Sequence, residues 1–287
     1  MPQISIIVRS YNDIEYIEKT MQMIKKQNLK DFEIINVDSA SADGTFEIVK
    51  KYNPNGIVYQ IKPGSYIPGK VLNEAISKSK GEIIVFNNSD CIPQNEHWLE
   101  NLVKPLLEDK EIISTFGNQL PRPNAIPVVR KDSERAFGNG KISATWFHFF
   151  SLATSAVTRK AITDFPFDPI IQYSEDIEWS FRMKNMGKKI VYVPDAIVEH
   201  SHNYTLKEVK KRFHGEGIAE GKIYGLHKTF FRDFLKPFIA EFLRDIIYLT
   251  KNREFFNIPY SFIYRVNQKY FVYKGNKDYF RKLKGKK

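Results

Sequence analysis

The sequence has few of the features that mark secreted, disulfide-bonded or membrane-spanning proteins. It has 287 residues but a single cysteine, Cys91, so no disulfide can form within the chain and we expect a reducing compartment. No apolar run is long enough to cross a bilayer. No signal peptide is expected either, because residues 2–12 carry Arg9 and no small-residue cleavage site follows. These absences predict a cytoplasmic protein.

Two glycine patterns that bind phosphates are also missing. The chain contains neither GxxxxGK[ST] nor GxGxxG, which disfavours binding of ATP or NAD by the common glycine loops. The composition, 42% hydrophobic and 27% charged, is typical of a globular protein with a sizeable core. The length allows one large domain or two.

Acidic residues are scarce in the last part of the chain. From His227 onward there are 15 Lys and Arg against 5 Asp and Glu, together with 16 of the 40 aromatic residues. Nearly all of the net charge of +11 therefore lies there, and we predict a domain over 1–226 followed by a basic, aromatic region over 227–287. A nucleic-acid-binding protein is disfavoured, because the basic excess lies outside the first domain and no RNP-like or zinc motif is present.

Short apolar runs alternate with helical patterns over the first half of the chain. This alternation predicts an α/β fold with a parallel sheet and right-handed crossovers. Predicted strands cover residues 3–10, 33–37, 57–61, 82–86, 111–117 and 189–193, with a further strand within Trp146–Val157.

Polar residues follow two of the predicted strands, where open α/β sheets bind ligands. Asp38 ends one strand, and Asn88-Ser89-Asp90 ends another that Pro93 is expected to stop. One carboxylate could accept the imide N–H of uracil or thymine while the other faces a diphosphate through a cation. The alternative is structural: Asp90 could cap the next helix, and Asp38 and Asp43 could be loop and cap residues.

Three segments in this order resemble the motifs of the family 2 glycosyltransferases, which are inverting nucleotide-sugar enzymes. The segments are SIIVRSYN, EIINVDSASADGT and GEIIVFNNSDCIP. The resemblance implies the GT-A fold, a Rossmann-like, mostly parallel sheet flanked by helices, here with a C-terminal helical, basic and aromatic extension.

The same resemblance implies roles for individual residues around the donor. Arg9 and Tyr11 would lie beside the nucleoside, and Asp38 would bind the base. We expect Lys70 to bind the donor as well. Asn88-Ser89-Asp90 stands where the family has Asp-x-Asp. Because Asn88 replaces the first Asp, the site keeps a carboxylate at Asp90 but loses one charge.

The segment Ser174–Arg182 resembles the Glu-Asp motif of these enzymes, where the Asp is the general base. Asp176 would take the proton from the acceptor hydroxyl, and Glu175 would orient an acceptor hydroxyl. The alternative is that acidic residues in a first helical turn merely suit the helix dipole.

The spacing from Glu175 to His200 resembles that of related enzymes in which a histidine completes the metal site. Asp90 and His200 would then hold Mn²⁺ or Mg²⁺, which stabilises charge on the leaving diphosphate. A packed or solvated histidine is the alternative. The segment from His200 resembles a rhamnosyltransferase-type branch, and Arg212 could hold the diphosphate; solvation is the alternative for this charge.

The basic tail contains an amphipathic helix whose apolar residues recur at helical spacing over 238–247. Aromatic residues mixed with cations suit a membrane headgroup region, so we predict peripheral contact with the inner face of the cell membrane and a lipid-linked saccharide acceptor. The alternative is that the apolar stripe packs on the catalytic domain. For the whole chain, the alternative to a transferase is a non-catalytic nucleotide-sugar-binding relative.

Overall fold

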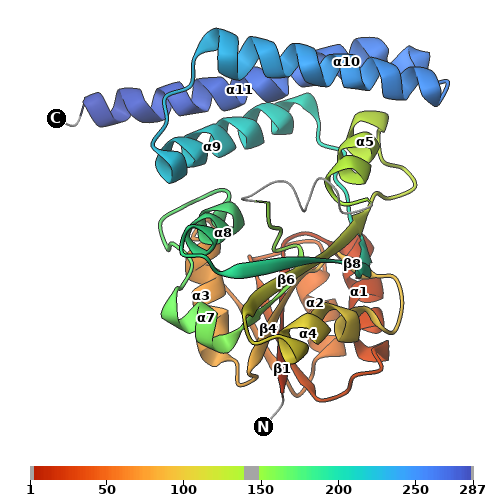
Figure 1. Ribbon diagram of the computed structural model, residues 1–287. Coiled ribbons are helices and arrows are strands. Elements are labelled where there is room, and N and C mark those ends of the chain that lie inside the picture. The colour runs from red at the N-terminus through yellow and green to blue at the C-terminus, as the bar shows by residue number, and fades with distance from the viewer. Residues whose placement is uncertain (1–2, 139–148, 286–287) are drawn as a thin grey trace. The chain divides into compact units, whose positions relative to one another are not determined.

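The computed structural model describes residues 3–138 and 149–285, which form two compact units (Figure 1). The sheet unit comprises Met1–Arg122, Ser133–Ile171 and Glu175–His200. The helical unit comprises Pro123–Asp132, Gln172–Ser174 and Ser201–Lys287. The predicted boundary between residues 226 and 227 falls inside the helical unit.

The sheet unit alternates strands and helices, as the sequence pattern predicts. Its strands are β1 (Ile4–Ser10), β2 (Phe32–Asp38), β3 (Ile57–Gln60), β4 (Ile83–Asn88), β5 (Ile92–Pro93), β6 (Ile112–Leu120), β7 (Thr154–Thr158) and β8 (Lys189–Glu199). Its helices are α1 (Ile14–Lys26), α2 (Thr45–Tyr52), α3 (Pro68–Lys78), α4 (Trp98–Glu108), α7 (Arg159–Asp164) and α8 (Glu175–Asn185).

The strands form one sheet in the order β3-β2-β1-β4-β7-β6-β8-β5. The first four are parallel, and β6 and β8 are parallel to each other, so the mostly parallel sheet is confirmed. Two strands are exceptions: β7 runs antiparallel to both β4 and β6, and the short β5 runs antiparallel to β8. The carboxyl ends of β1, β2 and β4 therefore meet at one rim, where ligands are expected.

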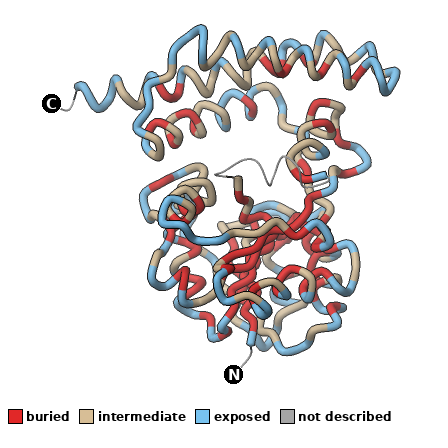
Figure 2. Tube along the Cα trace, in the orientation of Figure 1, coloured by how far each residue is buried: buried red, intermediate tan, exposed pale blue. Residues whose placement is uncertain are grey.

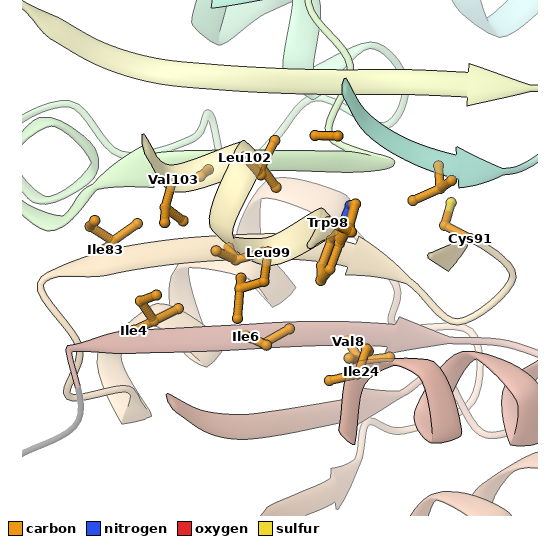
Figure 3. Packing of buried hydrophobic residues seen from close by; sticks show 14 of the residues in the cluster. Ile4, Ile6, Val8, Ile24, Ile83, Cys91, Trp98, Leu99, Leu102 and Val103 are labelled. Carbon is orange, nitrogen blue, oxygen red and sulfur yellow. The ribbon is translucent and has the colours of Figure 1, made fainter. Parts of the chain in front are cut away.

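Side chains alternate between the two faces of the sheet and bury a helical layer on each (Figure 1). On one face Ile4, Ile6 and Val8 pack with α1, α2 and α4 (Figure 3). On the other face Ile7 packs with α3, α7 and α8. The most continuously buried elements of this unit are accordingly β1, β2, β4, β6 and β7 (Figure 2). This alternation decides which face each strand-end residue joins.

A bulge in β8, whose residues 194–196 are skipped in the pairing, sets the register at which β6 delivers its last residues to the rim. The pairing of β6 with β8 is irregular between Gly117 and Asn118, so that Asn118 pairs with Ile197. A Cβ at Gly117 would lie 2.3 Å from the carbonyl oxygen of Ala196, so the close approach requires glycine. Beyond the bulge, β6 ends beside His200, whose N–H donates to Leu120 O at 2.9 Å.

Three expectations need correction or fall outside the described residues. The prolines and basic residues of 118–140 predict a long ordered loop, but this stretch contains the end of β6 and the helix α5 (Pro127–Ala136). Pro93 does not simply end a strand, since it belongs to the short strand β5 that pairs with β8. Of the segment Trp146–Val157, residues 146–148 lie outside the described residues, and its predicted strand corresponds to β7.

The helical unit contains part of α5 together with α9 (Leu206–Tyr224), a π-helical turn (Phe231–Leu235), α10 (Lys236–Lys251), a 3₁₀ turn (Phe255–Asn257) and α11 (Ile258–Lys284). Helix α9 begins with a capping box formed by Thr205 and Glu208. Glycines let α9 and α11 approach closely: a Cβ at Gly217 would lie 2.1 Å from Val272 O. Within the described residues, none of the helices combines the length and the apolar character that a bilayer-spanning helix requires.

The bulge generates a first prediction, for Gly117→Ala. The added methyl would collide with the carbonyl of Ala196, so we expect the free energy of unfolding to fall by about 1–3 kcal/mol. Urea unfolding followed by tryptophan fluorescence reports on this unit, where Trp98 and Trp179 are fully buried. Gly285→Ala is the control, because its nearest atom is 3.8 Å away. Equal stability of the two variants would contradict the prediction.

Candidate functional site at the carboxyl rim of the sheet

The ends of three parallel strands are joined by a row of side-chain hydrogen bonds on the α1 face of the sheet. Asp38 at the end of β2 pairs in register with Ser10 of β1 and Gln60 of β3. Its carboxylate accepts hydrogen bonds from Ser10 Oγ at 2.6 Å and from Gln60 Nε2 at 2.9 Å. It also accepts the N–H and the hydroxyl of Ser41, at 2.8 and 2.6 Å. Asp38 thereby orders the loop that follows β2 and aligns the Gln60 amide at the rim.

On the opposite face, Arg9 joins the end of β4 to the start of α8. Arg9 and Asn88 pair in register, and Arg9 Nε and Nη2 donate to Asn88 Oδ1 at 3.3 and 3.0 Å. Arg9 Nη1 donates to Glu175 Oε1 at 3.0 Å and to Tyr66 Oη at 3.2 Å. Both carboxylate and guanidinium of the ion pair are only 13% exposed. The replacement of Asp by Asn at position 88 leaves Glu175 as the charged partner of Arg9 in this cluster.

The acidic pair begins α8 after a residue with unusual backbone geometry. Ser174 has φ of +62°, a left-handed conformation that costs energy for a non-glycine residue and is concentrated at functional sites. Asp176 Oδ1 accepts the N–H of Ile177 at 2.8 Å. Burial raises the pKa of Asp176 to about 7, and the negative charge of Glu175 adds to the rise. Asp176 therefore exchanges its proton near neutral pH.

Asp90, Cys91 and His200 offer ligand atoms that all lie within 4.8 Å of one another. They come together because β5, just after Asp90, pairs with the end of β8, just before His200. His200 Nδ1 lies 2.7 Å from Gln119 Oε1, and because an amide oxygen only accepts, Nδ1 carries the proton. The lone pair of Nε2 is then directed elsewhere, and Nε2 lies 3.5 Å from Asp90 Oδ2.

This donor set fits a divalent cation. A carboxylate and a neutral imidazole suit Mn²⁺ or Mg²⁺, and adjacent ligands of an octahedral ion lie about 3 Å apart, close to the observed separation. Cys91 is a poor ligand, because burial and the nearby charge of Asp90 raise the pKa of its thiol well above the usual value. Asp90 and His200 are thus the residues that could hold the ion, with Gln119 orienting the imidazole.

Two further residues at this rim escaped the sequence analysis as site residues. Arg122 Nη2 donates to Asp90 O at 2.6 Å and lies 3.5 Å from Asp90 Oδ2, and its guanidinium stacks 3.7 Å from the Tyr16 ring centroid. Asp13 accepts a short hydrogen bond from the Ser89 hydroxyl, and burial raises its pKa. The only sequence signal for Arg122 was its place between two prolines after a predicted strand.

The remaining predicted residues lie as follows. Tyr11 is 60% exposed just beyond β1, and Lys70 is exposed in the first turn of α3. Arg212 belongs to α9 of the helical unit, where its Nε donates to Glu216 Oε1 at 2.9 Å. The backbone N–H of Tyr11 donates to Asp13 Oδ2 at 3.2 Å, which ties the end of β1 to the rim.

The sequence also allows purely structural roles, in loops or helix caps, for Asp90, Asp43 and Asp38. Asp90 does not cap α4, because that helix begins at Trp98 with His97 at its N-cap. Asp43 is a loop and cap residue, since its carboxylate accepts the N–H groups of Thr45 and Ile14. Asp38 fills an ordering role in the loop while also standing at the rim.

Comparison with known proteins identifies the family and the fold. The model of the family described as glycosyl transferase family 2 matches residues 5–163. An O-antigen chain rhamnosyltransferase of Salmonella anatum is 29% identical over 232 residues, covering 76% of this chain and 72% of its own. One of Salmonella typhimurium is 26% identical over 229 residues, covering 75% and 72%.

Solved structures with the same fold include glycosyltransferases bound to donor and metal. A mannosyltransferase from Pyrobaculum calidifontis, in complex with GDP-Man and Mn²⁺, superposes with a TM-score of 0.62 at 19% identity, covering 93% of this chain and 74% of that one. Glucosyl-3-phosphoglycerate synthase from Mycobacterium tuberculosis, with Mn²⁺, UDP-glucose and phosphoglyceric acid, gives 0.54 at 22% identity, covering 73% and 75%. The chain has the GT-A fold, and it is a glycosyltransferase that belongs to family 2.

Proposed function

We propose that this enzyme transfers a sugar, with inversion, from a nucleoside diphosphate sugar to a hydroxyl of a saccharide acceptor. The observation that carries the proposal is the acidic pair at the start of α8. Asp176 has a pKa of about 7, and its neighbour Glu175 is ion-paired to Arg9, which also contacts Asn88 at the donor side of the rim. A carboxylate with such a pKa next to a donor site is suited to general base catalysis.

In the proposed reaction Asp176 accepts the proton of the acceptor hydroxyl as its oxygen attacks the anomeric carbon. The bond between that carbon and the diphosphate oxygen breaks on the opposite face, so the configuration inverts and the diphosphate leaves with the bonding electrons. Glu175, held by Arg9, orients an acceptor hydroxyl. Positioning of this kind supplies a large part of the rate enhancement in group transfer.

The donor is proposed to be a UDP- or dTDP-sugar. Asp38 and Gln60 stand at the rim on the α1 face, where a carboxylate and an amide suit the imide and carbonyl groups of uracil or thymine. Direct pairing of the base with Asp38 would exchange one of its present hydrogen bonds. A rhamnosyl donor is supported by the two Salmonella relatives, both of which are named as rhamnosyltransferases.

A divalent cation, Mn²⁺ or Mg²⁺, is proposed to bind at Asp90 and His200. When bound, it would stabilise the negative charge on the leaving diphosphate. Arg122 places a second positive charge beside Asp90, independently of any cation. The family motif offers two carboxylates, but here Asn88 replaces the first. Asp90 and His200 therefore become the main protein ligands of the proposed cation.

The acceptor is proposed to be a lipid-linked saccharide that is extended at the inner face of the cell membrane, with the C-terminal region in contact with the membrane. Support comes from the relatives' action on an O-antigen chain, as their names state, and from the cationic, aromatic composition of the tail. The enzyme would work in the cytoplasm as a peripheral membrane protein.

Replacing Asp176 by Asn tests the role of the base. Asn cannot accept the proton, so we expect the transfer rate to fall by about 10²–10⁴-fold while the affinity for the nucleoside diphosphate is retained. Release of nucleoside diphosphate in the presence of an acceptor measures the rate. Asp164→Asn is the control, because Asp164 forms a surface ion pair with Lys160. An unchanged rate in Asp176→Asn would eliminate Asp176 as the base.

The pH dependence of transfer gives a second test. The base must be deprotonated to work, and the pKa of Asp176 is about 7, so kcat/KM should rise with pH through neutrality and level off above it. Initial rates between pH 5.5 and 9 at constant ionic strength would show this. A profile that is flat, or that falls over the same range, would contradict the assignment.

Mn²⁺ binding tests the cation site independently of turnover. His200→Ala removes a ligand and Gln119→Leu removes the hydrogen bond that fixes the imidazole, so Mn²⁺ affinity should fall by about tenfold to a hundredfold in each. Isothermal titration with Mn²⁺ in the presence of nucleoside diphosphate measures it. His97→Ala, at an exposed histidine, should bind like the unmodified enzyme. Equal affinity in all four proteins would place the ion elsewhere.

A further inference from the structure

Helix α10 of the helical unit has its charged face inside and its apolar face outside. Asp245 is fully buried, and its carboxylate accepts hydrogen bonds from Arg265 Nε at 2.7 Å and from Ser261 Oγ at 2.5 Å, as well as a short one from Lys131 Nζ. Glu241 is also buried, and it pairs with the same Lys131 at 3.3 Å. A helix of a soluble domain normally has the reverse arrangement.

The opposite side of α10 exposes aliphatic side chains at four-residue spacing. Ile239 is 46% exposed, Leu243 54% and Ile247 67%. These residues are i, i+4 and i+8, so they form one stripe along the helix. We refer to them as the α10 stripe. The stripe leaves apolar side chains in water on a helix whose acidic residues are paired on the opposite side.

Further exposed aromatic residues lie on the neighbouring elements of the helical unit. Phe238 and Phe242 of α10 both contact Phe262 of α11, with ring centroids 5.4 and 5.3 Å apart, and Phe262 is itself 46% exposed. Just after the other end of α10, Phe256 is 96% exposed in the 3₁₀ turn. The tube trace shows the segment between α10 and α11 as mostly exposed (Figure 2).

The charges around this surface have one sign. All five acidic residues between 227 and 287 are ion-paired to Lys or Arg: Asp233, Glu241, Asp245, Glu254 and Asp278. By contrast, Lys236, Lys251 and Arg253 are exposed at the two ends of α10. An apolar stripe flanked by cations, with its acidic groups neutralised, is complementary to an anionic lipid surface.

We propose that the α10 stripe and Phe256 form the surface by which this enzyme binds an anionic bilayer, with α10 lying in the headgroup region. This inference rests on the proposed function, because a lipid-linked acceptor would require the enzyme to work at a membrane. A second copy of the chain is a poorer occupant, since a symmetric dimer across this face would bring its cations toward one another. The buried ion pairs keep α10 helical while its apolar side remains free to insert.

Vesicle co-sedimentation of the full chain without any donor tests the inference. We expect binding to phosphatidylglycerol–phosphatidylethanolamine vesicles that weakens as salt rises from about 0.1 to 0.5 M, and little binding to phosphatidylcholine vesicles. The double variant Leu243→Glu/Ile247→Glu should lose about tenfold or more of the bound fraction, because it places charge in the inserting stripe.

A matched control separates the surface from a general effect of added charge. Leu107→Glu/Ile170→Glu changes two apolar residues of the sheet unit that are 43% and 76% exposed, and it should bind vesicles like the unmodified chain. Circular dichroism and the Mn²⁺ titration should be unchanged in both double variants.

The outcomes distinguish this inference from the proposed function. Equal vesicle binding by the two double variants, or no binding by the unmodified chain, would overturn the membrane surface and leave the base test at Asp176 untouched. A concentration-dependent dimer that only Leu243→Glu/Ile247→Glu abolishes, without vesicle binding, would assign the surface to a second copy instead. If the unmodified chain binds vesicles but shows no transfer activity, the membrane surface is supported and the proposed reaction fails.

Discussion

The guanidinium of Arg9 is the interaction on which the candidate active site depends. A largely buried cation needs partners, and Arg9 finds them in Asn88, Glu175 and Tyr66, which come from three different parts of the chain. Because Asn88 belongs to the strand that leads to Asp90, and Glu175 precedes Asp176, one side chain connects the donor side of the rim to the proposed base. Removing it would leave Glu175 without its charged partner in the cluster and the start of α8 without its tie to the sheet.

The departure at Asn88 acquires a physical meaning in this setting. With Asp at this position, Arg9 would be shared between two carboxylates, whereas Asn offers a neutral acceptor and leaves Glu175 as the anion. The charge of Arg9 lowers the pKa of Asp176, but burial and the negative charge of Glu175 outweigh it and keep that pKa raised. The same substitution leaves Asp90 and His200 as the main ligands of the proposed cation, so Asn88 bears on both the proposed base and the proposed cation site.

The two units are stabilised by different means. The sheet unit has two apolar layers built on alternating strand residues such as Ile6 and Ile7. The helical unit has a small apolar cluster around Val209 and Tyr264, and relies on buried ion pairs and on close packing of α9 against α11 at glycines. Using charges inside allows α10 to keep its apolar residues outside, an arrangement that makes sense for a surface that contacts something apolar.

Local patterns in the sequence were sufficient for the strands that end at Ser10, Asp38 and Asn88, because parallel strands buried on both faces read as short apolar runs followed by polar turns. The motif spacing also led to the roles proposed for Asp176 and His200. The roles of Gln119 and Arg122 could not be read in this way, since neither stands in a recognisable pattern. Their contacts depend on the β-bulge in β8 opposite Gly117 and on the return of the chain after Pro121. The helix α5 was missed because prolines and basic residues in 118–140 resemble a loop.

The sequence by itself determined the family, the alternation of strands and helices, and the polar residues at the strand ends, because these follow from local periodicity and from motifs of adjacent residues. Only the tertiary structure decided that Arg9 pairs with Glu175 across 166 positions of the chain and that α10 has its charges inside. Both outcomes depend on which partner is near a charge once the chain has folded. Hydrophobic periodicity identifies the apolar side of a helix, but it does not say whether that side faces a core, and at α10 the buried partners of Asp245 decide the matter.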